Sequence, residues 1–127
     1  MTYGQNPTPE EEYQSIINKV KKGEDIDTDY TKLRMLYAQT SQYQPESKER
    51  DDSILKMTQA WVDKRYDEAI QLGNQLLEEE YLNPFVHDLF AKIYKETGSG
   101  DAFFHMLMFI NVITSIQGDG KSYETAY

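Results

Sequence analysis

Two ten-residue stretches decide the fold of this chain: residues 67–76 read DEAIQLGNQL, and residues 101–110 read DAFFHMLMFI. A shift of 34 residues places Asp67 on Asp101 and Leu76 on Ile110. An aspartate side chain accepts hydrogen bonds from the free N–H groups at a helix start, so each aspartate is predicted to cap a helix. The sequence therefore predicts two helices in one register, at a spacing typical of helical repeats.

The segments in front of these two helices correspond as well. The same shift places Leu55 on Leu89. Asn83 followed by Pro84 predicts a helix start, since proline suits the first helical position, and Gly98 predicts the end of that helix. The apolar face of this helix is formed by Val86, Leu89, Phe90, Ile93 and Tyr94. The helix that starts at Asp67 has its own apolar face, formed by Ala69, Gly73, Leu76 and Leu77.

A further helix is predicted to end near Lys64. Residues 46–52 are highly charged and form either a loop or the first turns of this helix. Its stripe consists of Ile54, Leu55, Thr58, Trp61 and Val62. We expect Trp61 to pack in the core, as a single tryptophan on an amphipathic stripe usually does.

The N-terminal third predicts a separate helical hairpin. Thr8 and Glu11 have the spacing of a capping box, and Gly23 supplies the left-handed stop for a helix with apolar side chains at Tyr13, Ile16, Ile17 and Val20. A second helix starts near Thr28–Asp29 and ends near Thr40, with Tyr30, Leu33, Leu36 and Tyr37 on one face.

The last helix, from Ala102 to Ile116, is apolar nearly all round. Such a helix is expected to be buried on most sides, with Phe104 in the core that the last two hairpins share. Gly118 is expected to end it. The alternating residues Tyr123–Tyr127 could begin a strand.

These elements predict an all-α fold. We expect six antiparallel helices, joined by short loops, to form stacked helical hairpins in a single domain. The expected divisions are a loose tail (1–7), an N-terminal hairpin (8–40), two further hairpins (46–117) and an irregular or strand-forming tail (118–127).

Residues 51–117 resemble the tetratricopeptide repeat. Tyr66-Asp67-Glu68-Ala69-Ile70 looks like the start of the second helix of such a repeat, and Ala91, Tyr94 and Gly98 match the small, aromatic and turn-glycine positions of the next first helix. Two positions depart from the pattern: Pro84 falls about three residues late, and Phe103 stands where the family prefers alanine. The resemblance implies a module that binds proteins or peptides.

A second resemblance rests on the ending, residues 118–127, and on Leu36-Tyr37 with Tyr43-Gln44-Pro45. These residues are similar to segments of small, apparently exported bacterial proteins that form a domain of unknown function. The resemblance implies an exported or periplasmic protein in which β-rich sequence follows. The residues themselves are also compatible with a cytoplasmic location, because the chain starts without a recognisable export signal.

Composition excludes several classes of function. The 13 Lys and Arg against 22 Asp and Glu give a net charge of −9, so we expect no binding to nucleic acid, whose affinity depends on cationic contacts. No cysteine is present for a disulfide or a thiolate metal site. No apolar run reaches the ~18 residues of a membrane span.

Three motifs are weak candidates for ligand sites. Gly120-Lys121-Ser122 lacks the earlier glycine of a phosphate loop, since Ser115 stands there. Residues 25–29 carry alternating aspartates, but Tyr30 and Leu36 replace the glycine and glutamate of a calcium loop. His87 and His105 lack the spacing of a zinc signature. We therefore expect neither cofactor nor metal.

The sequence favours a non-enzymatic module that binds a protein or peptide. In tetratricopeptide arrays the first helix of each pair lines a concave groove, which would place there the candidate contact residues Thr58, Phe85, Asp88, Lys92 and Lys95. The alternative is a small-ligand binder or an enzyme with its site near the Gly118–Tyr127 tail and a missing β-rich half. The candidates in the tail are Asp119, Lys121, Ser122 and Tyr123.

Overall fold

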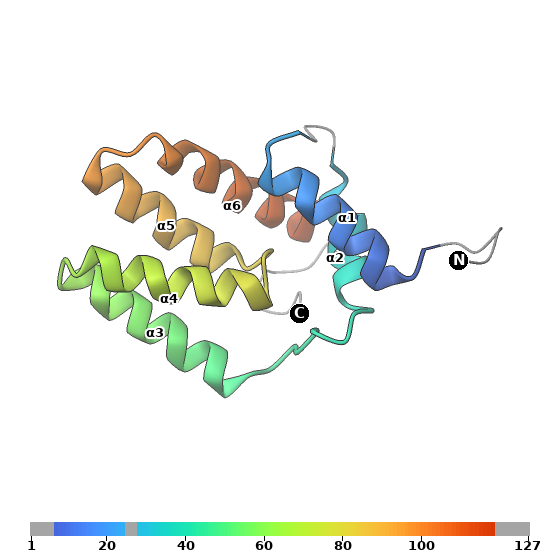
Figure 1. The fold of residues 1–127 in the computed structure, drawn as a ribbon, viewed down its shortest axis with the longest axis horizontal. Helices are drawn as coiled ribbons and strands as arrows, with labels where there is room; N and C mark the ends of the chain where they lie inside the picture. Colours follow the sequence, from blue (N-terminus) through green and yellow to red (C-terminus); the bar gives the residue numbers. More distant parts are fainter. Residues whose placement is uncertain (1–6, 25–27, 119–127) are drawn as a thin grey trace. The chain divides into compact units, whose positions relative to one another are not determined.

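The computed structural model describes residues 7–24 and 28–118, and these residues form six α-helices and no strand. The prediction of an all-α fold is confirmed. The chain divides into two compact units, residues 1–43 and 44–127 (Figure 1). The boundary falls between the N-terminal hairpin and the two hairpins that follow the 34-residue register.

The first unit pairs α1 (Pro9–Lys21) with α2 (Tyr30–Tyr37). The predicted capping box is confirmed: the Thr8 hydroxyl accepts from the Glu11 N–H, and the Glu11 carboxylate accepts from the Thr8 N–H. Gly23 follows the helix end with φ +69°, a conformation that costs glycine little. Asp29 caps α2 by accepting from the Lys32 N–H at 3.1 Å.

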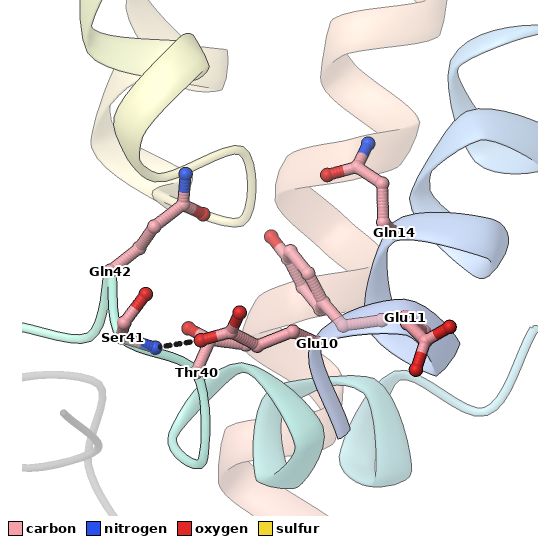
Figure 2. Close-up of a pocket in the computed structure, with 7 residues that line it drawn as sticks. Glu10, Glu11, Gln14, Thr40, Ser41 and Gln42 are labelled. Atoms are coloured by element: carbon pink, nitrogen blue, oxygen red, sulfur yellow. Dashed lines mark hydrogen bonds between the residues drawn. The ribbon is translucent and has the colours of Figure 1, made fainter. Parts of the chain in front are cut away.

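The core of the first unit lies between the two predicted stripes. Figure 2 shows the open end of the hairpin, where the Ser41 N–H donates to the Glu10 carboxylate at 2.6 Å. The ring of Tyr37 contacts the rings of Tyr13 and Tyr43. The buried side chains of this unit include Tyr13, Ile17, Val20, Leu33, Leu36 and Tyr37.

The second unit consists of two helical hairpins. The first pairs α3 (Lys48–Val62) with α4 (Tyr66–Glu79), and the second pairs α5 (Pro84–Thr97) with α6 (Asp101–Gly118). Both α3 and α4 contact α5, which joins the hairpins, while among the described residues of this unit α6 packs against α5 alone (Figure 1).

The helix ends confirm some of the predicted caps and correct others. Asn83 caps α5 through its side-chain oxygen, and Gly98 ends that helix at φ +77°. Asp67 and Asp101, however, do not cap their helices. Arg65 occupies the N-cap position of α4, and Asp101 is itself the first residue of α6. Both aspartates lie in the first turn, where a carboxylate still favours the positive end of the helix dipole.

Gly73 lies where three helices meet. A β-carbon at this position would lie 2.5 Å from Cζ of Phe90 on α5 and 2.6 Å from Cε of Met57 on α3. The missing side chain is therefore what allows α4 to approach both neighbours. The buried side chains of the three helices include Met57, Ala60, Ala69, Leu76, Leu77, Leu89, Phe90 and Ile93.

The stripe predicted for α3 is wrong in part. Leu55 and Val62 are largely exposed, whereas Met57 and Ala60 form the buried face. Trp61 and Phe104 are half-buried rather than fully packed. The α3 side chain that meets α4 at Gly73 is that of Met57, so the face of α3 that carries Met57 and Ala60 is covered and the face that carries Leu55 is not.

The expectation that α6 is buried on most sides is also wrong. Only Met108, Val112 and Ile116 are buried along this helix. The physical reason is that, among the described residues of its unit, α6 has one helical neighbour, which covers one face of the helix.

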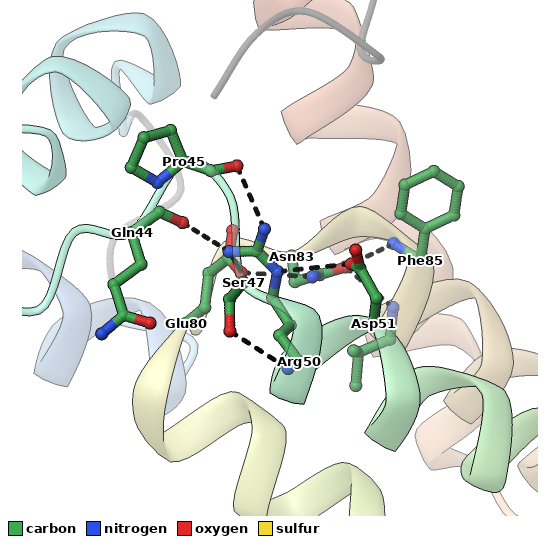
Figure 3. A network of polar contacts seen from close by, with 9 residues as sticks. Gln44, Pro45, Ser47, Arg50, Asp51, Glu80, Asn83 and Phe85 are labelled. Carbon is green, nitrogen blue, oxygen red and sulfur yellow. Dashed lines mark hydrogen bonds and ion pairs between the residues drawn. The ribbon is translucent and has the colours of Figure 1, made fainter.

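A buried polar network connects the beginning of α3 with the end of α4 and the start of α5 (Figure 3). The Arg50 guanidinium donates to the carbonyls of Gln44 at 2.6 Å and Pro45 at 3.1 Å, and it contacts the Glu80 carboxylate at 3.3 Å. Glu80 also accepts from the Asn83 amide at 3.2 Å. Burial raises the pKa of Glu80, and the Arg50 charge opposes that increase.

Gly73→Ala is expected to reduce the free energy of unfolding by about 2 kcal/mol, because the added methyl group must displace Phe90 and Met57. Urea denaturation would measure the change. Gly118→Ala is the matched control, since nothing lies within 4 Å of a β-carbon there. Equal stability of Gly73→Ala and the parent would contradict the close approach.

Arg50→Gln is expected to cost about 3 kcal/mol, because it leaves the buried Glu80 carboxylate without its cation. Glu80→Gln should cost less, since the amide keeps an oxygen toward Arg50 and Asn83. The loss of unfolding free energy in Arg50→Gln should shrink as pH falls from 7 to 5, because protonation of Glu80 removes the uncompensated charge. Urea denaturation at both pH values would show this, and a deficit that does not change with pH would contradict it.

Candidate functional site

A groove runs between α5 and α6 and has a volume of about 180 Å³. Met106 and Phe109 of α6 line one side of it, and α5 contributes the predicted contact residues Asp88, Lys92 and Lys95 to the other. We call this the α5–α6 groove; its seven lining residues are Asp88, Ala91, Lys92, Lys95, Ala102, Met106 and Phe109. Apolar atoms form most of its surface, with the charged groups of α5 beside them.

The three charged residues lie on one side of α5 because they are spaced at i, i+4 and i+7. The Lys92 ammonium lies 2.9 Å from the Asp88 carboxylate and 5.4 Å from the centre of the Trp61 ring. Both side chains of this pair are partly exposed, so the pair contributes little to stability. The Lys95 ammonium forms no ion pair with any residue that the structure describes.

The remaining predicted contact residues do not line this groove. The Thr58 hydroxyl donates to the Ile54 carbonyl of its own helix at 2.8 Å. Phe85 is partly exposed in the first turn of α5, where its N–H donates to Asn83. The tail candidates Asp119, Lys121, Ser122 and Tyr123 lie outside the described residues, as do the expected strand and residues 25–27 of the aspartate motif.

Polar contacts occupy the side on which α3 meets α5. The Glu96 carboxylate accepts from the Trp61 indole N–H at 3.0 Å and from the Tyr66 hydroxyl at 2.9 Å. The hydrogen bond to Glu96 raises the pKa of Tyr66, since the bond is made by the neutral phenol. The resemblance to tetratricopeptide arrays placed the groove between the first helices of the pairs, whereas the groove that collects Asp88, Lys92 and Lys95 lies between α5 and α6.

An exposed apolar stripe continues from this groove along α6. We call Phe103, Met106, Leu107 and Ile110 the α6 stripe; their exposed fractions are 62%, 45%, 41% and 47%. They recur at i, i+3, i+4 and i+7 and lie roughly opposite the buried face of the same helix. Met106 belongs to both the stripe and the groove, so the two form one surface. Sequence reasoning missed this surface because it took all-round apolarity as evidence of burial.

A pair of stacked histidines joins α5 to α6 beneath this surface. The Nδ1 atoms of His87 and His105 lie 2.9 Å apart, and Nε2 of His87 lies 2.6 Å from the Tyr81 carbonyl oxygen. A carbonyl can only accept, so Nε2 of His87 donates to it. In the neutral ring Nδ1 of His87 then accepts, which makes Nδ1 of His105 the donor. The rings of Phe90 and Tyr94 stack on His105.

Burial keeps both imidazoles neutral. It lowers the pKa of His87 to about 4, and the nearby His105 ring adds to that shift. Burial likewise lowers the pKa of His105 to about 4. The pair is therefore a neutral hydrogen-bonded contact that holds α6 against α5, with the protons placed by the Tyr81 carbonyl.

The stability of the protein should fall as pH decreases from about 6.5 to 4. In this range the unfolded chain binds protons to its two histidines and the folded chain does not, so protonation favours unfolding. His87 should contribute on the order of 3 kcal/mol by pH 4, and the more exposed His105 less. Titration by NMR should show neither ring protonating above pH 5; a midpoint near 6.5 for His87 would contradict this prediction.

A second pocket, of about 310 Å³, lies in the first unit between α1 and residues 40–42 (Figure 2). Its carboxylates are already engaged, Glu10 by the Ser41 N–H and Glu11 by the Thr8 N–H. These hydrogen bonds lower the pKa of both carboxyl groups. The Gln14 amide likewise donates to Asn18 at 2.9 Å. These polar groups of the pocket are thus used in hydrogen bonds within the hairpin, and we assign no ligand to the pocket.

Within residues 7–24 and 28–118, no three metal-binding side chains of the His, Cys, Asp or Glu type gather around one point. None of the helices in these residues combines the length and apolarity needed to cross a bilayer.

Comparison with family models, with curated proteins and with solved structures finds no match to this chain. The resemblances to tetratricopeptide repeats and to exported bacterial proteins therefore stay predictions.

Proposed function

We propose that this chain is a non-enzymatic helical module that binds a protein or peptide through the α6 stripe and the α5–α6 groove. The observation that carries the proposal is the exposure of four large apolar side chains on one face of one helix. Contiguous exposed apolar surface is unusual in soluble domains and is typical of protein interaction sites. The groove beside it offers a recess for one apolar side chain of the partner.

The size of the groove also supports a macromolecular partner. At about 180 Å³ it is smaller than the ~300–1,000 Å³ of typical small-molecule pockets. The tetratricopeptide-like interpretation agrees with the pairing of α3 with α4 and of α5 with α6, and with the contact between α3 and α5. Partner binding by an exposed helix face, with side chains at i, i+3, i+4 and i+7, is a common mode of recognition.

The test is a selection of peptides from a displayed random library on the immobilised protein. Peptides selected on the parent should bind the double variant Phe103→Gln, Leu107→Gln at least tenfold more weakly, measured by fluorescence polarisation. Both residues are substantially exposed, so the melting temperature should change by only a few degrees.

Leu55→Gln is the matched control, because Leu55 is equally apolar and 68% exposed but lies on α3, away from the stripe. It should leave the affinity of the selected peptides unchanged. Selected peptides that bind the double variant as tightly as the parent would overturn the proposal, as would a selection that yields no binding peptide.

A further inference from the structure

We infer that the partner is an acidic amphipathic helix, which lays its apolar face on the α6 stripe and directs carboxylates at Lys92 and Lys95. This inference rests on the proposed function and adds the chemistry of the partner. Three features of the surface support it: the spacing of the stripe, the lack of charged residues in α6 after Asp101, and the two ammonium groups on the rim of the groove.

The spacing of the stripe matches one face of a second helix. Phe103 and Ile110 are seven residues apart, which corresponds to about 10 Å along the helix axis. A partner helix of two to three turns covers that length with side chains at i, i+3, i+4 and i+7. The groove between α5 and α6 then receives one of these side chains, because Met106 belongs to both the groove and the stripe.

The charges beside the stripe favour one sign of charge on the partner. Residues 102–118 of α6 contain no Asp, Glu, Lys or Arg, so the apolar face itself favours neither sign. The rim on α5 carries two ammonium groups and one carboxylate, and that carboxylate is already paired with Lys92. The Lys95 ammonium, without an ion-pair partner among the described residues, is the group best placed to accept a new carboxylate.

The net charge of −9 does not prevent this approach. At physiological ionic strength the Debye length is about 8 Å, so an exposed group is influenced mainly by charges close to it. Glu96, one residue beyond Lys95, is hydrogen-bonded to Trp61 and Tyr66 on the side facing α3. The side chains that line the groove, two lysines and one aspartate, therefore carry a net charge of +1, although the chain as a whole is acidic and Asp101 stands at the start of α6 outside this lining.

Three synthetic helical peptides test the inference with the whole chain. They share one apolar face, with leucine or phenylalanine at i, i+3, i+4 and i+7, and carry Glu, Gln or Lys at every flanking position. At low salt the Glu peptide should bind about fivefold tighter than the Gln peptide, and the Lys peptide should bind most weakly. The preference should shrink as salt is added.

Charge reversal at the rim should reverse the order of the peptides. In Lys92→Glu, Lys95→Glu the Lys peptide should become the tightest binder; Lys95→Glu alone, which leaves the pair between Asp88 and Lys92 intact, should abolish the preference for Glu. Lys56→Glu is the matched control, because Lys56 is an exposed lysine of α3 outside the groove. It changes the net charge by the same amount as Lys95→Glu and should leave the order unchanged.

The outcomes separate the inference from the proposed function. If all three peptides bind with equal affinity and lose binding in Phe103→Gln, Leu107→Gln, the inference of an acidic partner is wrong and the proposed apolar site is supported. Absence of binding by all three would overturn both. Sedimentation of the free protein as a dimer that dissociates in the same double variant would assign the stripe to a second copy of the chain and overturn the inference.

Discussion

The second unit depends on one close approach, that of α4 to α3 and α5 at Gly73. The backbone of α4 at this position lies so near Phe90 and Met57 that no β-carbon fits without movement. Because α5 joins the two hairpins and is the neighbour of α6, the position of α5 at this junction also fixes where the groove and the stripe lie. The Arg50–Glu80–Asn83 network acts at one end of the same helices, where it holds the loop before α3 against the turn between α4 and α5.

Local signals predicted most of the fold because they act within a few residues. The capping box of Thr8, the cap at Asn83 and the left-handed glycines at 23 and 98 need only their own helix ends, and all of them were predicted. The caps proposed at Asp67 and Asp101 failed because Asp is favourable both at the N-cap and in the first turn, so the residue type alone does not separate these positions.

The candidate site was predicted only in part, because its shape depends on which helices become neighbours. The spacing of Asp88, Lys92 and Lys95 placed them on one side of α5, and the structure lines them along one groove. Their opposite wall, Met106 and Phe109, was not foreseen, since apolarity all round α6 does not tell how many neighbours the helix has. The hydrogen bond between His87 and His105 could not be predicted from the sequence, because only the folded backbone places the Tyr81 carbonyl beside His87.

Trp61 makes the docking of the two hairpins visible by spectroscopy. It is the one tryptophan of the sequence, it lies on α3, and its indole N–H donates to Glu96 on α5 while Lys92 lies over its ring. Intrinsic fluorescence therefore reports separation of α3 from α5, whereas far-ultraviolet circular dichroism reports the helices themselves. Because α3 and α5 belong to different hairpins, these two signals need not change together. Their divergence during denaturation would measure how strongly the hairpins are coupled.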